Sequence, residues 1–230
     1  MNSSPIDMIE IVAEGLGELI EKVVFVGGAV ASLYCDDAAA RKVRPTTDVD
    51  FIIEIYSNRE YAELEEELRK YGFKHDMSPG APICRKIYND VKVDVMPTES
   101  SVLGFTNRWY SEGITRSEKT TLPSTREISI LPLPYYLGSK IEAFKQRGNN
   151  DYLFSHDIED IITVLDGRVN LYTLIDADTS IKDYLKAELG FMADDIHFIE
   201  SVSGHIGYGT TRTARASRII DFIKEFNGIS

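Results

Sequence analysis

Three aspartates lie in a pattern suited to binding divalent cations. Asp48 and Asp50 flank Val49 at the start of an apolar run, and Asp94 lies among alternating valines in the run 91–96. Side chains alternate across a β-strand, so Asp48 and Asp50 should share one face. If the two strands are neighbours, the three carboxylates converge on an oxygen-rich site for Mg²⁺ or Mn²⁺. Two such ions can stabilise the transition state of phosphoryl transfer.

A pair of glycines, Gly27 and Gly28, follows the short β-branched and aromatic run 22–26. A glycine turn between a strand and a helix presents backbone N–H groups to phosphate. The alternative is a tight turn that only requires a positive φ. The Asp-x-Asp pair alone is weak evidence, because glycosyltransferases use the same pair to hold the metal ion of a nucleotide sugar. Its combination with the glycines favours nucleotide chemistry.

This combination resembles the DNA polymerase beta-like nucleotidyltransferase superfamily, whose members carry Gly-Gly or Gly-Ser after one strand, Asp-x-Asp on a second and a third carboxylate on a later one. The resemblance covers about residues 20 to 97. It implies that Asp48 and Asp50 bind two metal ions, and that Asp94 binds the catalytic ion and helps to activate the attacking hydroxyl. It further implies that Gly27 and Gly28 hold the β- and γ-phosphates, and that Arg44 or Thr47 contacts the nucleotide. Many members have a serine where Gly28 stands, so that phosphate contact would come from the backbone.

A second group of charged residues lies in the C-terminal half. Lys140 interrupts the apolar stripe of the expected helix 134–147, so its amine must either extend to solvent or reach an anion. Farther on, His156 precedes the pattern Asp-x-x-Asp-Ile, which begins at Asp157 and includes Asp160. The alternative, non-functional interpretation of Asp157 is an acid in a first helical turn, which the helix dipole favours, and that of Asp160 is a solvated flank.

The lysine and the Asp-x-x-Asp-Ile pattern resemble AbiEii-type nucleotidyltransferases, which include toxins of toxin–antitoxin and abortive-infection systems and related mycobacterial toxins that add nucleotides to tRNA ends. The resemblance implies that Lys140 contacts the nucleotide phosphates and that Asp157 orients or assists it. The family usually has Arg or Lys before that aspartate, whereas here His156 occupies the position. This resemblance covers most of the chain to about residue 167 and does not extend beyond it.

The elements that must position these residues follow from periodicity and caps. We expect a helix over 4–20, a strand over 22–26, a helix over 29–33, a strand over 48–55, a helix from Ser57 to Gly72 and a hairpin, 84–88 with 91–96, around Asn89-Asp90. Residues 99–126 should be loops with at most one strand. A last strand, 128–133, should precede helices over 134–147, 157–165, 181–199 and 213–226.

This order predicts an α/β (α+β) nucleotidyltransferase fold: a small mixed sheet with flanking helices, followed by a helical C-terminal domain. The expected domains are a catalytic domain, 1–126, and a mostly helical domain, 127–230, that completes the cleft. The order is not the βαβ alternation of a doubly wound dinucleotide fold, and no P-loop is present.

Composition limits the function further. The chain has 230 residues, of which 43% are hydrophobic and 27% charged, which is typical of globular proteins and argues against disordered or membrane classes. Its net charge of -12 argues against wrapping duplex DNA. Cys35 and Cys84 are expected to be buried free thiols. The first residues lack a signal-peptide pattern, so we expect a cytoplasmic protein.

The resulting hypothesis is an enzyme that transfers an NMP from an NTP to an acceptor hydroxyl and releases pyrophosphate. By resemblance, the acceptor is a tRNA or other RNA end, and an antitoxin is a partner. Arg212, Arg215 and Arg218 either meet RNA phosphates or form a solvated face. The alternatives are a small-molecule enzyme of the aminoglycoside-modifying kind, which suits the acidic surface, and a non-catalytic nucleotide-binding module on the same fold.

Overall fold

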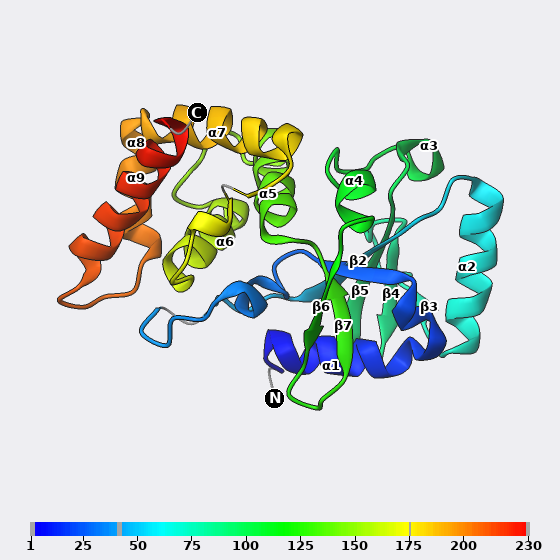
Figure 1. Cartoon of the computed structure of the whole chain (residues 1–230). Coiled ribbons are helices and arrows are strands. Elements are labelled where there is room, and N and C mark those ends of the chain that lie inside the picture. The colour runs from blue at the N-terminus through cyan, green and yellow to red at the C-terminus, as the bar shows by residue number, and fades with distance from the viewer. Residues whose placement is uncertain (1–2, 41–42, 175, 229–230) are drawn as a thin grey trace. The chain divides into compact units, whose positions relative to one another are not determined.

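The strands of the protein join in one mixed sheet (Figure 1). A computed structural model describes residues 3–40, 43–174 and 176–228. In this part of the chain the sheet has seven strands in the order β3-β4-β5-β2-β1-β7-β6. The predicted small mixed sheet with flanking helices therefore agrees with the structure at the level of a mixed α/β architecture.

The centre of the sheet comes from the most apolar runs. β1 (Val23–Val26) is buried at all four residues, as a central strand covered on both faces should be. It pairs antiparallel with β2 (Asp48–Ile53), which in turn pairs parallel with β5 (Val91–Pro97). On its other side β1 pairs parallel with β7 (Glu127–Ile130).

The predicted hairpin is confirmed. β4 (Arg85–Tyr88) and β5 are joined by Asn89 and Asp90, both with positive φ, 44° and 64°. Two-residue hairpin turns of this handedness match the twist of the strands and favour Asn and Asp. The sheet is completed by β3 (Lys74–His75) beside β4 and by β6 (Glu118–Thr121) beside β7.

Helices flank the sheet. α1 (Pro5–Gly15) begins at a capping box formed by Ser4 and Asp7, and it packs against β2 and β5. It ends earlier than the predicted residue 20, because Gly17 adopts a left-handed conformation (φ 55°) and a 3₁₀-helix follows, Gly17–Glu21. α2 (Asn58–Lys70) is capped by Ser57, whose hydroxyl accepts a hydrogen bond from the Glu60 N–H. The expected loop region 99–126 also contains short helices, α3 (Ser100–Leu103) and α4 (Tyr110–Ile114).

The C-terminal half is helical, as predicted. Its helices are α5 (Leu133–Arg147), α6 (His156–Gly167), α7 (Thr179–Ala193), α8 (Ile196–His205) and α9 (Arg212–Gly228), with a 3₁₀-helix at Tyr172–Leu174. The prediction of one helix over 181–199 is wrong. α7 ends at Ala193, and the Asp195 carboxylate caps α8 by accepting a hydrogen bond of 2.9 Å from the His197 N–H.

The chain forms two compact units. The first comprises residues up to Val30 together with Pro45–Pro132, and the second comprises Ala31–Arg44 together with the chain from Leu133 onward. This division differs from the expected boundary after residue 126. β7 belongs to the sheet, and the segment after Val30 is anchored to α6 through backbone N–H groups of Asp36 and Asp37, which donate to the Gly167 carbonyl at 2.9 and 2.8 Å. Among the described helices, none has the length and apolar character needed to cross a lipid bilayer.

Candidate active site

The sheet places the aspartates of the first unit side by side. β2 and β5 are neighbouring parallel strands, with Asp50 directly opposite Asp94 and Asp48 opposite Lys92. Residues opposite each other in a sheet share a face. The three carboxylates therefore lie on one face of two adjoining strands, because the apolar residues between them, Val49 and Val93, are fully buried on the other.

A guanidinium lies between two of these carboxylates. Arg85 stands opposite Asp94 in the β4–β5 hairpin, and its Nε and Nη2 donate to the two oxygens of Asp94, each at 2.7 Å. The same Nη2 donates to Oδ2 of Asp48 at 3.1 Å. Hydrogen bonds to Asp94 hold the pKa of Arg85 above its ordinary value. Sequence reasoning missed Arg85, although counting back from the Asn89-Asp90 turn pairs residue 85 with residue 94.

The remaining oxygen of Asp48 is also engaged, because the Thr46 hydroxyl donates to its Oδ1 at 3.0 Å. Across the described ranges, no group of three or more His, Cys, Asp or Glu side chains is arranged to hold a metal ion. The donor set nevertheless fits a hard divalent cation, since it consists of carboxylate oxygens and already holds a cationic group between Asp48 and Asp94. A metal ion there would have to replace the guanidinium.

The Asp50 carboxylate lies on the same face but close to the glycine turn. Gly27 has a φ of 77°, and a Cβ at that position would lie 1.9 Å from Oδ2 of Asp50. A glycine is therefore required twice, by the backbone conformation and by the approach of the carboxylate. Gly28 follows as a buried turn residue. The structure thus gives Gly27 the role of a tight turn that closes against Asp50, and its predicted phosphate contact stays a prediction.

The helix expected after the glycines is much reduced. In place of an α-helix over 29–33 the chain forms a single 3₁₀-turn, Ala31–Tyr34. The expected phosphate site required a helix N-terminus directly after the glycines. A single 3₁₀-turn aligns too few peptide groups to produce the dipole of such a helix. Thr47 is exposed immediately before β2.

The predicted residues of the second unit form a buried ion network. Nζ of Lys140 donates to Asp160 at 2.6 Å and to Asp157 at 3.2 Å. Arg147 forks onto both oxygens of Asp157, each at 2.9 Å. Arg44, which adjoins the segment before β2, forks onto both oxygens of Asp160 at 2.9 and 3.1 Å. Three cations therefore alternate with two carboxylates.

The lysine and the two aspartates of this network are buried. Lys140 is 5% exposed and Asp160 is fully buried, so the lysine reaches anions instead of solvent and the expected solvated flank for Asp160 is wrong. Burial acts to raise the pKa of Asp157, but the hydrogen bonds of Arg147 and the charge of Lys140 outweigh it and the pKa is lowered. The Asp157 carboxyl is consequently charged at neutral pH.

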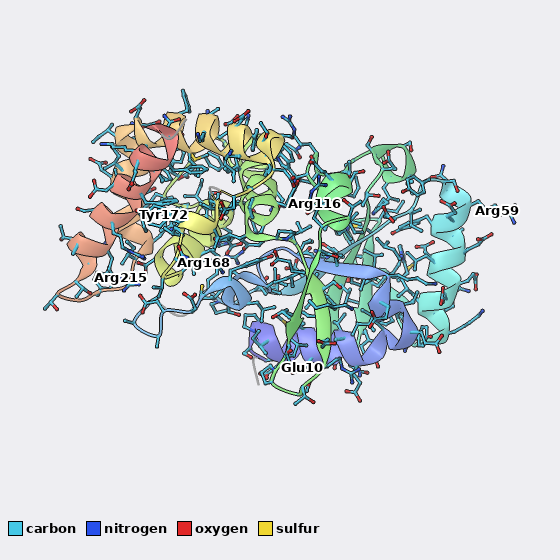
Figure 2. The ribbon with its side chains drawn as sticks, in the orientation of Figure 1. Glu10, Arg59, Arg116, Arg168, Tyr172 and Arg215 are labelled. Atoms are coloured by element: carbon cyan, nitrogen blue, oxygen red, sulfur yellow. The ribbon has the colours of Figure 1, made fainter. Side chains whose placement is uncertain are left out.

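The C-terminal arginines also act inside their unit. Arg215, labelled in Figure 2, donates from Nε to Asp166 at 2.7 Å and from Nη2 to Asp37 at 2.9 Å. Arg218 donates to the Asp166 carbonyl at 2.7 Å, and Arg212 donates to the Ser203 carbonyl. The expectation of a solvated face is therefore wrong, since these arginines hold α9 against neighbouring elements of the second unit.

Cysteine chemistry is not part of the site. Cys35 and Cys84 are free thiols, as predicted, but Cys35 is only partly buried, whereas Cys84 is fully buried. Burial raises the pKa of each thiol to about 11. A thiol of this kind is protonated at neutral pH and is a poor nucleophile.

No protein-family model matches the sequence, and no curated protein matches it significantly. The site therefore has to be interpreted from its own geometry.

Proposed function

We propose that this protein is a metal-dependent nucleotidyltransferase, which transfers an NMP from an NTP to an acceptor hydroxyl and releases pyrophosphate. The observation that carries the proposal is the register of β2 and β5, which puts Asp48, Asp50 and Asp94 on one face beside the Gly27 turn. Sheet strands hold carboxylates rigidly, as a site for phosphoryl transfer requires.

In this proposal Asp48 and Asp50 hold two divalent cations and Asp94 holds one of them. Bound there, the cations would neutralise the charge that develops on the transferred phosphoryl group. Asp94 also accepts the proton of the attacking hydroxyl or orients that hydroxyl. By the resemblance, Lys140 would contact the nucleotide phosphates and Asp157 would orient or assist it. Both side chains already bind each other within the second unit, so these two roles stay predictions.

Two acceptors are in contention. The AbiEii-type resemblance favours a tRNA or other RNA end, with an antitoxin as partner. The net charge of -12 favours a small cationic acceptor of the aminoglycoside kind, because negative surface charge repels RNA and attracts cations. Both acceptors use the same metal site.

The test is incubation of the full chain with each radiolabelled NTP and Mg²⁺, in the presence of total tRNA or of a mixture of aminoglycosides. We expect label in one acceptor, identified by gel or by mass spectrometry. Asp48→Asn and Asp94→Asn should each reduce transfer by about 10²–10⁴-fold. Asp90→Asn, in the exposed hairpin turn, is the matched control and should leave transfer unchanged, because Asn also accepts positive φ.

Transfer that survives Asp48→Asn and Asp94→Asn would overturn the assigned site. Binding of NTP that depends on Mg²⁺, with no transfer to any acceptor, would favour the non-catalytic nucleotide-binding module.

A further inference from the structure

One nitrogen atom occupies the position between two candidate metal ligands. Nη2 of Arg85 lies 2.7 Å from Oδ2 of Asp94 and 3.1 Å from Oδ2 of Asp48. A divalent cation that bridges these carboxylates would bind the same two oxygens. The guanidinium and the cation therefore compete for one place.

The two occupants exclude each other by distance as well as by charge. Mg²⁺ needs its oxygen ligands at about 2.0–2.1 Å, in nearly octahedral geometry. Both oxygens of Asp94 bind Arg85, and the oxygens of Asp48 are divided between Arg85 and Thr46. A cation can bridge Asp48 and Asp94 from the position of Nη2 only if the guanidinium leaves that position.

The structure also shows what can move. The backbone of Arg85 is fixed in β4, where it pairs with Asp94 and where the Asn89-Asp90 turn sets the register. Its side chain is 17% exposed, so part of it already contacts solvent. The displacement is therefore a movement of the Arg85 side chain, with the strand pairing kept.

We propose that Arg85 is an internal counterion that competes with the divalent cation for Asp48 and Asp94 and that transfers to the nucleotide phosphates when the metal–nucleotide complex binds. This inference rests on the proposed function. The planar guanidinium fork matches phosphate as well as it matches carboxylate, so the incoming triphosphate can take over the hydrogen bonds that Asp94 gives up. Metal binding is then weak without nucleotide and strong with it.

The experiment measures Mn²⁺ affinity by electron paramagnetic resonance on the full chain, with and without a non-hydrolysable methylene-bridged NTP. Without nucleotide, Arg85→Gln should bind Mn²⁺ at least tenfold more tightly than the unmodified protein, and Arg85→Lys should lie between them. Arg59→Gln is the matched control, since Arg59 on α2, labelled in Figure 2, is 88% exposed and pairs with Glu63. It makes the same charge change and should leave Mn²⁺ affinity unchanged.

A second measurement tests the transfer to phosphate. The nucleotide should raise Mn²⁺ affinity at least tenfold more in the unmodified protein than in Arg85→Gln, because binding linkage is reciprocal. Thermal unfolding verifies that each variant is folded, and Arg85→Lys supplies the comparison if Arg85→Gln is not.

The outcomes separate the two proposals. Equal or weaker Mn²⁺ binding by both Arg85 variants would overturn the counterion role while leaving the nucleotidyltransferase proposal intact. No Mn²⁺ binding by any variant, with or without nucleotide, would overturn both. Tighter binding in Arg85→Gln that persists after Asp94→Asn is added would also refute the inference, because the competition would then not involve Asp94.

Discussion

Gly27→Ala is a direct test of the contact between the glycine turn and Asp50. An alanine at a φ of 77° is destabilised by about 1–2 kcal/mol through its left-handed backbone. Its Cβ would also lie 1.9 Å from Oδ2 of Asp50, and overpacking of this kind adds about 1–3 kcal/mol. We therefore expect the free energy of unfolding of the first unit to fall by about 2–5 kcal/mol, the sum of these two effects.

The chain offers a probe and a matched control. Trp109 is the single tryptophan and is buried in the first unit, so its fluorescence during urea unfolding reports on that unit. Gly80 has a φ of 79°, but a Cβ there would meet nothing within 4 Å. Gly80→Ala should therefore show only the backbone effect of about 1–2 kcal/mol.

A double-mutant cycle isolates the steric part. Asp50→Ala removes the carboxylate that the new Cβ would meet, so the combination with Gly27→Ala should recover about 1–3 kcal/mol relative to additivity. Equal effects of Gly27→Ala and Gly80→Ala, or strict additivity in the cycle, would refute the claim that Gly27 exists to admit the Asp50 carboxylate.

The buried network of the second unit gives two further predictions. Lys140→Met should destabilise that unit by about 3 kcal/mol, because Asp157 and Asp160 each lose a buried cation while keeping an arginine. Lys145→Met, on the same helix but 44% exposed, should change the free energy of unfolding by less than about 1 kcal/mol. Urea unfolding followed by circular dichroism at 222 nm measures both, and equal destabilisation by the two variants would contradict this reasoning. Because the pKa of Asp157 is lowered in the folded state, its charge should stabilise the folded protein above the unfolded-state pKa of about 3.9. This stabilisation should disappear as the pH falls through the folded-state pKa of Asp157. An Asp157→Asn variant whose stability falls with acid as much as that of the unmodified protein would contradict this prediction.

Short-range signals made the sheet and its aspartates predictable. The alternation around Asp48 and Asp50 fixes which side chains share a face, and the Asn89-Asp90 turn fixes the register of the hairpin that carries Asp94. These features depend on neighbouring residues, so a sequence contains them. The adjacency of β2 and β5 was only a conditional expectation, because no local rule decides which strands pair.

The partners of the charged groups were not predictable for the same reason. Arg44 and Asp160 are 116 residues apart in the chain, and no periodicity links them. The hydrogen bonds from the backbone N–H groups of Asp36 and Asp37 to the Gly167 carbonyl, just after the 3₁₀-turn, are also long-range contacts without a local signal.

The charged groups of the second unit bear on the choice of acceptor. An acidic protein could still hold an RNA end if its basic residues gathered beside the nucleotide, and the sequence suggested three such groups, at 41–44, 140–147 and 212–218. Arg41 and Lys42 lie outside the described residues. In the structure Arg44, Lys140 and Arg215 each bind a carboxylate of their own unit. Such cations can bind RNA phosphates only by giving up a buried partner, which costs about 3–5 kcal/mol for each broken pair. Under the proposed function, a small cationic acceptor requires no such exchange, so these ion pairs favour it over RNA.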